Sequence, residues 1–226
     1  MKSYRILFIG NSHTYLHYMP WMLEQLAQAA MSPKKLRTDQ VTGKGASLAW
    51  HWKNRATHNM LSDESWDYVV LQDRSGGPLE DPVSMQKYAR LLDAEIKKQG
   101  ARTLFYMTWA KRGQPKAQRI IRHAYVRAAR EADALLAPVG TAWENALKAD
   151  PGLRLHHEDD RHANPAGAYL SACVFFTVIC QASPEGLPGT LYLSDRCLVD
   201  LKKNKAAFLQ KIAFKAVHSK AKMIPG

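Results

Sequence analysis

The sequence predicts an α/β protein, a three-layer α/β/α sandwich with about five parallel strands. Short apolar stretches rich in β-branched and aromatic residues alternate with amphipathic stretches of helical length. A helix between two strands is the usual crossover of a parallel sheet, whose two faces the helices then cover. The 226 residues, 46% of them hydrophobic, suffice for one core and contain no evident linker. We therefore expect one domain over residues 1–226.

The five expected strands share an apolar, β-branched or aromatic composition. They span residues 4–10, 35–43, 66–72, 101–109 and 134–140. Helical spacing of apolar residues predicts helices over 20–31, 47–58, 81–100, 116–133, 164–180 and 200–218. Ser47 is the expected N-cap of the second helix, and Gly76-Gly77 is expected to be a flexible turn.

The composition narrows the classes of function. The net charge is +12, but the basic residues are dispersed, whereas a nucleic-acid binder usually concentrates them on one element with interleaved aromatics. Dispersal favours a solvated basic surface, and nucleic-acid binding stays a minor alternative. No stretch approaches the roughly 18 to 20 apolar residues of a membrane helix, and the N-terminus lacks a signal-peptide cleavage site. We expect a cytoplasmic protein without a membrane partner; the sequence gives no indication of its oligomeric state.

Cys173, Cys180 and Cys197 cannot all pair within one chain, and no C-x-x-C spacing is present. They are expected to be reduced structural thiols. The sequence predicts neither a metal nor a cofactor.

Sites in open parallel sheets gather in the loops that follow the strands. The first such loop reads Gly10-Asn11-Ser12-His13-Thr14. A serine hydroxyl is a poor nucleophile until a histidine base, oriented by a carboxylate, removes its proton. Ser12 also has a backbone N–H that can stabilise an oxyanion. The alternative is that Ser12 only caps the following helix.

A candidate base lies late in the chain, in a segment that leads into the helix over 164–180. Asp159 precedes His162 by three residues, a spacing that lets its carboxylate reach the imidazole Nδ1 and leaves Nε2 for the nucleophile. Two alternatives compete: a solvated helix start, or a metal site formed by the histidines and acids of residues 156–162. Diverging side chains and the lack of a second ligand cluster disfavour the metal.

Together, GNSHT after the first strand and DDRHANPAGAYLSA near the C-terminus resemble the SGNH (GDSL-like) hydrolase superfamily. The first block matches that family's G-D-S pattern with Asn11 at the second position, and Asp159 and His162 match its D-x-x-H block. The resemblance implies a flavodoxin-like sandwich and a cofactor-free serine esterase with the triad Ser12, His162 and Asp159.

The resemblance also implies oxyanion donors after the second and third strands. Gly45 is the expected backbone donor beside the Ser12 N–H, with Gly43 as the alternative. The family's third block supplies an asparagine, and this chain has Gln72 there instead. The Gln72 amide is therefore expected to be the third donor. The alternative for Gln72 is a strand-end amide that satisfies loop backbone.

Three further residues are candidates for contact with substrate: Trp109, Arg112 and Asn11. Trp109 is equally consistent with a packed loop anchor. The expected substrate is a small-molecule or carbohydrate ester with a short acyl group such as acetyl. The alternatives are an inactive domain of this type that binds a glycan or other ligand, and a basic nucleic-acid-associated α/β domain.

Overall fold

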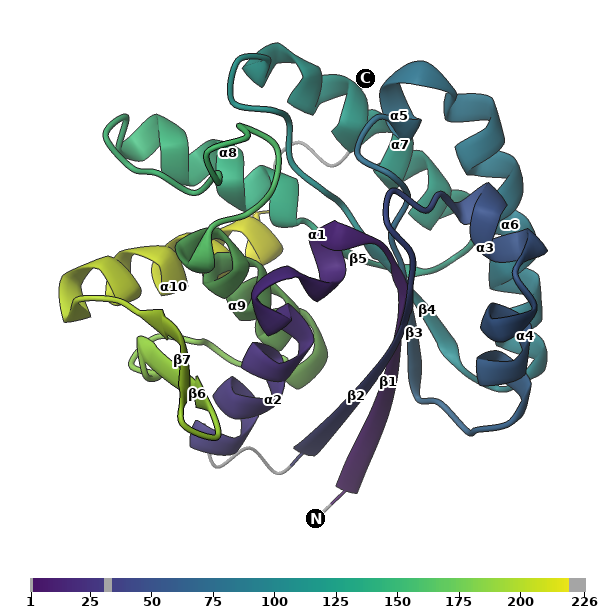
Figure 1. Ribbon diagram of the computed structural model, residues 1–226, viewed down its shortest axis with the longest axis horizontal. Helices are drawn as coiled ribbons and strands as arrows, with labels where there is room; N and C mark the ends of the chain where they lie inside the picture. The colour runs from purple at the N-terminus through teal and green to yellow at the C-terminus, as the bar shows by residue number, and fades with distance from the viewer. Residues whose placement is uncertain (1, 31–33, 220–226) are drawn as a thin grey trace.

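The computed structural model describes residues 2–30 and 34–219, and its centre is a five-stranded parallel sheet (Figure 1). The strands are β1 (Lys2–Gly10), β2 (Lys34–Thr42), β3 (Tyr68–Leu71), β4 (Arg102–Tyr106) and β5 (Leu135–Ala137). Their order is β2-β1-β3-β4-β5, and every neighbouring pair is parallel. The predicted parallel α/β/α architecture is confirmed.

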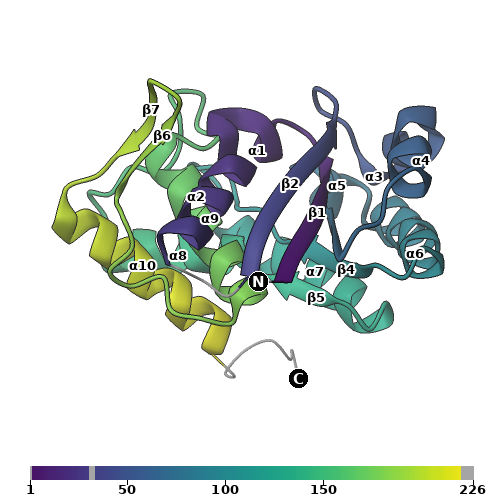
Figure 2. The ribbon, with the colours of Figure 1, turned by 90° about the horizontal axis from the view of Figure 1, so that it is seen from below.

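Helices cover both faces of the sheet because each strand alternates its side chains between two cores. Ile6 and Phe8 belong to one core, and Leu7 and Ile9 belong to the other. Figures 1 and 2 show one set of helices on each face. On the first are α2 (Met19–Ala29), α8 (Val139–Ala149), α9 (Pro165–Cys180) and α10 (Lys203–His218). On the second are α3 (Leu48–Lys53), α4 (Arg55–Ser62), α6 (Pro82–Lys98) and α7 (Gln118–Glu131).

Several predicted elements differ from the structure: the strand expected over 101–109 ends at Tyr106, the helix expected over 200–218 begins at Lys203, and α8 was not predicted. Met31, at the end of the helix expected over 20–31, lies outside the described residues. Two further differences have an identifiable cause. The strand expected over 134–140 ends at Ala137, because Pro138 follows and the chain enters α8 at Val139. The helix expected over 47–58 is divided at Asn54, whose side chain accepts a hydrogen bond from the Ala56 N–H and starts a second helix.

Several short elements were not predicted. The segment after Gly10 forms α1 (Ser12–Tyr15) and the 3₁₀ turn η1 (Leu16–Tyr18) before α2 begins. A second 3₁₀ turn, η2 (Pro115–Ala117), precedes α7, and α5 (Gly77–Glu80) replaces the expected flexible turn. The antiparallel hairpin of β6 (Thr190–Leu193) and β7 (Arg196–Asp200) lies between α9 and α10 in the chain.

Cys173, Cys180 and Cys197 form no disulfide within the described residues: Cys173 is buried in α9, Cys180 is half-buried at its end, and Cys197 is exposed in β7. Within residues 2–30 and 34–219, no helix has the combined length and apolarity that a membrane crossing requires.

The junction between β4 and α8 depends on a glycine. A Cβ at Gly140 would lie 2.0 Å from the Thr108 carbonyl oxygen, whereas one at Gly113 would meet nothing within 4 Å. We expect Gly140→Ala to lower the free energy of unfolding by about 1–3 kcal/mol, because a backbone atom must move to relieve the overlap. Urea unfolding measures this, with Gly113→Ala as the control. Equal stability of the two variants would contradict the close approach.

Candidate active site

Asn11 shapes the turn that presents Ser12. It is the N-cap of α1: its Oδ1 accepts the His13 N–H at 3.1 Å, and its backbone oxygen accepts the Thr14 N–H at 2.8 Å. Ser12 is therefore the first helical residue, and its N–H has no partner among the described residues. The alternative that Ser12 caps this helix is wrong, because Asn11 has that role.

The structure brings Ser12, His162 and Asp159 into one line of hydrogen bonds. Ser12 Oγ lies 2.8 Å from His162 Nε2, and His162 Nδ1 is bonded to Asp159 Oδ2. Asp159 Oδ1 accepts the N–H groups of His162 at 2.9 Å and Arg161 at 3.1 Å. The line lies at the surface: the side chains of His162 and Asp159 are 25% and 43% exposed.

The environment of Asp159 favours its ionised form. Desolvation is the largest single effect and raises the pKa of this carboxyl, but the hydrogen bonds from the His162 side chain and two backbone N–H groups together outweigh it. The pKa of Asp159 therefore lies well below its ordinary range. An ionised Asp159 keeps a proton on His162 Nδ1, which leaves the Nε2 lone pair for Ser12.

Trp109 and Arg112 hold the segment that carries Asp159 and His162. The Trp109 Nε1–H donates to the Arg161 carbonyl at 2.9 Å, and the Arg112 N–H donates to the Asp160 carbonyl at 3.0 Å. Trp109 is only 3% exposed, so it is a packed anchor, and its expected contact with substrate is not supported. Arg112 is exposed, and its guanidinium lies 3.4 Å from the Asp160 carboxylate.

A column of aromatic rings runs behind the histidine. Its successive members are His162, His13, Trp109, Trp143 and His156, with ring centroids 5.4, 4.8, 4.0 and 4.9 Å apart. The two indoles are stacked at 3°. Burial, with a smaller contribution from His162, lowers the pKa of His13 to about 3. His13 is therefore neutral near pH 7 and adds no positive charge beside His162.

Gln72 joins the loop after β3 to the loop after β1. Its Oε1 accepts the Asn11 N–H and the Thr14 hydroxyl, each at 3.0 Å, and its Nε2 donates to the Asp73 carbonyl. The side chain has no exposed surface. The expectation that Gln72 donates to an oxyanion does not agree with this arrangement, because an enclosed amide cannot reach a substrate. The alternative, a strand-end amide that satisfies loop backbone, fits.

Gly45 lies in the loop after β2 with φ +66° and is exposed. The Gly43 N–H donates to the Gly10 carbonyl at 3.3 Å, which removes Gly43 as an alternative donor. The Asn11 Nδ2 donates to the Ala46 carbonyl at 2.8 Å and so ties this loop to the Ser12 turn. Asn11 is 2% exposed and both ends of its amide are bonded, which argues against the expected contact with substrate.

Asp73 anchors the start of α3 on the other side of this loop. Its Oδ1 accepts the Leu48 N–H at 2.8 Å, and burial raises the pKa of its carboxyl to about 6. The predicted N-cap Ser47 accepts the Trp50 N–H in the same turn. Two hydrogen bonds thus fix where the Gly45 loop ends and α3 begins.

The capping role of Asn11 and the ring column were not predicted from the sequence. The preference of Asn for N-cap positions is a signal for the first. No spacing in the sequence links His13, Trp109, Trp143 and His156, since the fold alone brings them together. Among the described residues no group of His, Cys, Asp and Glu has the geometry of a metal site.

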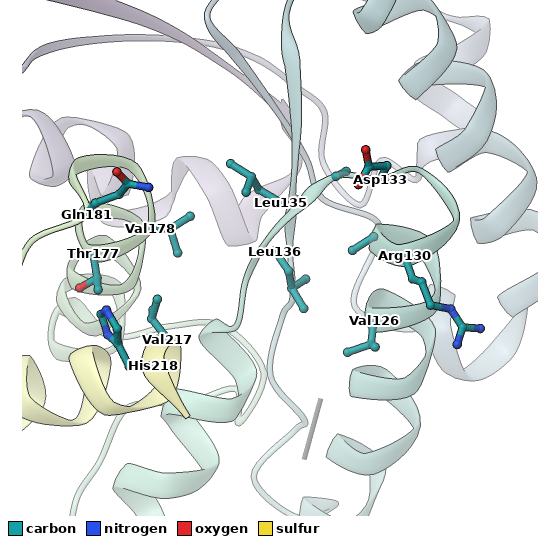
Figure 3. Close-up of a pocket in the computed structure, with 12 residues that line it drawn as sticks. Val126, Arg130, Asp133, Leu135, Leu136, Thr177, Val178, Gln181, Val217 and His218 are labelled. Carbon is teal, nitrogen blue, oxygen red and sulfur yellow. The ribbon is translucent and has the colours of Figure 1, made fainter. Parts of the chain in front are cut away.

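One cavity of about 670 Å³ lies away from this site (Figure 3). Leu135 and Leu136 of β5 lie between residues of α7 on one side and residues of α9 and α10 on the other. The C-terminal ends of these helices lie near the start of β5, at the N-terminal ends of the parallel strands. Ser12, by contrast, follows the C-terminal end of β1. None of the predicted site residues lines this cavity.

The chain matches no curated protein and no protein-family model. Solved structures do match. A candidate SGNH hydrolase from Slackia heliotrinireducens is 30% identical, with a TM-score of 0.66 over 79% of this chain and 100% of that chain. A DUF4886 family protein from Bacteroides uniformis is 20% identical, with a TM-score of 0.77 over 96% and 95%. An acetyl xylan esterase is 18% identical, with a TM-score of 0.63 over 77% and 99%.

Replacing Gln72 tests its structural role. Gln72→Met keeps the approximate shape and removes the acceptor for the buried Asn11 N–H, so we expect the free energy of unfolding to fall by about 1–3 kcal/mol. Chemical denaturation measures the change. The exposed Gln114→Met is the control, and we expect it to have little effect. A Gln72→Met protein as stable as the control would show that the buried amide is dispensable.

The buried neutral His13 predicts a pH-dependent stability. Between its ordinary value of 6.5 and its folded value of about 3, the unfolded chain binds a proton that the folded chain does not. The contribution of His13 to the free energy of unfolding is fully present above pH 6.5. It decreases as the pH falls below that value, by at most about 1.4 kcal/mol per pH unit. The loss of stability between pH 7 and pH 4.5 should be smaller for His13→Phe than for wild type. The exposed His123→Phe should keep the wild-type loss; equal losses for all three would contradict the assignment.

Proposed function

The chain belongs to the SGNH hydrolase family, and we propose that it is a serine esterase with Ser12 as nucleophile, His162 as general base and Asp159 as orienting carboxylate. The single observation that supports this most is the 2.8 Å contact of Ser12 Oγ with His162 Nε2, whose ring is bonded to Asp159 on its other nitrogen. That geometry suits proton transfer from a hydroxyl to an imidazole.

The proposed reaction has two halves. Ser12 Oγ attacks the ester carbonyl while His162 Nε2 takes the hydroxyl proton, and the tetrahedral intermediate collapses as His162 returns that proton to the leaving alcohol. Water then attacks the acyl-enzyme with His162 again as base, and the carboxylic acid leaves. The hydrogen bond to Asp159 stabilises the imidazolium that forms in each half.

The proposed oxyanion donors are the backbone N–H groups of Ser12 and Gly45. The Ser12 N–H is unpartnered among the described residues although its neighbours in the turn are bonded. Gly45 has an exposed backbone with φ +66°, a conformation that glycine adopts without strain. The bond from Asn11 to the Ala46 carbonyl sets the distance between these two donors. Gln72 is not part of this proposal, because its amide is enclosed.

A short acyl group on a carbohydrate or another small alcohol is the proposed substrate. Asp159 is exposed and His162 is partly exposed, which leaves room for a bulky alcohol. Trp50, 45% exposed, lies in α3 directly after the Gly45 loop, and its ring provides apolar surface for a sugar ring. Two of the similar structures are an acetyl xylan esterase and an acetyl-xylooligosaccharide esterase.

A fluorophosphonate probe together with short-chain aryl esters and acetylated sugars tests the proposal. We expect labelling and hydrolysis in wild type and neither in Ser12→Ala, because the attacking atom is gone. Asp159→Asn should lower turnover by roughly 10²- to 10⁴-fold, because the amide no longer holds the reactive tautomer of His162. Ser194→Ala, in the turn of the β6–β7 hairpin, is the control and should match wild type.

A folded wild-type protein whose Ser12 reacts with no probe and no ester would overturn the esterase assignment. That result would leave a domain that binds a ligand without turning it over.

A further inference from the structure

A second cavity, of about 210 Å³, lies behind the segment that carries Asp159 and His162. The segment after β4, the start of α7 and the side of α8 form its walls, and His156 closes one end. Ser12, Asp159, His162 and Gly45 do not line it. It is therefore separate from the residues to which the proposed ester hydrolysis is assigned.

The charges around this cavity favour an anion. Lys111, Arg112 and Lys148 line it, against the single carboxylate of Glu144. Glu144 is already bonded to Lys148 at 2.8 Å and to the guanidinium of Arg122. Lys148 is paired in this way, and Arg112 lies 3.4 Å from the Asp160 carboxylate, so three wall cations face two carboxylates. The local charge is still positive, and a bound carboxylate would be attracted.

The interior favours a ligand with an apolar body. The half-buried Leu147 supplies most of the apolar surface, and the buried rings of Trp109 and Trp143 contribute only their edges, because they are 3% and 1% exposed. The volume is below the roughly 300–1,000 Å³ of sites for drug-sized molecules. A flat or branched carboxylic acid of benzoate size matches the volume, the charge and the apolar walls.

The cavity walls contact the proposed catalytic segment directly. His156 Nε2 donates to the Ala110 carbonyl at 3.0 Å, and Trp109 and Arg112 donate to the carbonyls of residues 161 and 160. The ring column continues from Trp143 through Trp109 and His13 to His162. A ligand bound beside Trp143 would therefore contact one end of a packed series of rings whose other end is His162, the proposed base.

We propose that this cavity is an effector site for a small carboxylate with an aromatic or branched apolar body, and that its occupancy changes the reactivity of Ser12. The first part of this proposal, that a carboxylate binds in the cavity, does not depend on catalysis. The second part, that binding changes the reactivity of Ser12, rests on the proposed esterase function, whose product is itself a carboxylate. The coupling runs through the packed rings and through the hydrogen bonds to residues 160 and 161.

Binding is tested on the Ser12→Ala protein, in which no turnover interferes, by calorimetric titration with sodium benzoate. We expect benzoate to bind and benzyl alcohol, which lacks the charge, to bind at least tenfold more weakly. Leu147→Trp fills the cavity and should weaken benzoate binding at least tenfold. Ala149→Trp, exposed on the same helix, should leave benzoate binding unchanged.

Lys148→Met tests the charge, because it removes one cation without added bulk. It should weaken benzoate binding as well, with Lys211→Met of α10 as its control. Benzoate binding that is absent, or equal in Leu147→Trp and Ala149→Trp, would overturn the site.

Coupling is tested by the rate at which the fluorophosphonate labels Ser12, with and without saturating benzoate. We expect at least a threefold change in wild type and Ala149→Trp, and none in Leu147→Trp. An effect that persists in Leu147→Trp means that benzoate competes in the Ser12 cleft, and it would overturn the coupling. If Ser12 never labels, the esterase proposal and the coupling fail, while the titration still decides the site.

Discussion

The enclosed amide of Gln72 is the interaction on which the candidate site depends. β1 and β3 are neighbours in the sheet, but the chain leaves them in different directions, first toward β2 and later toward β4. At this divergence the backbone of Asn11 has lost its strand partner, and the Gln72 Oε1 replaces it. Because the amide is buried, loss of this bond would leave an unsatisfied N–H at the residue before Ser12. The direction of the Ser12 side chain follows from this contact.

Asn11 extends the same constraint to a second loop. Its side chain caps α1 with one atom and holds the Ala46 carbonyl with the other. The Asn11 amide therefore ties together the two loops that carry the proposed oxyanion donors, the N–H groups of Ser12 and Gly45. Preorganisation of this kind matters because an oxyanion hole that has to form during the reaction loses much of its benefit.

The third component, the segment with Asp159 and His162, is held differently. Asp159 is exposed and His162 is partly exposed. The position of the segment depends on donors from the loop after β4 and on the rings behind His162. His13, Trp109 and Trp143 make that support apolar, and burial keeps His13 neutral. The acid and base are thus supported by close-packed buried rings, and Trp109 and Trp143 also line a separate cavity.

Most of the alternating strands and helices, the loop that contains Ser12, and the short segment in which Asp159 precedes His162 could be predicted from the sequence. These features are local, because a periodicity or a three-residue spacing can be recognised without knowing the fold. The fold was needed to show that Asn11 caps α1, that Gln72 is enclosed and that Trp109 is packed against Trp143. An Asn, Gln or Trp side chain can contact a substrate or form a hydrogen bond with a neighbouring backbone group, and the sequence does not distinguish the two roles. Burial, which depends on contacts distant in sequence, is what separates the two uses.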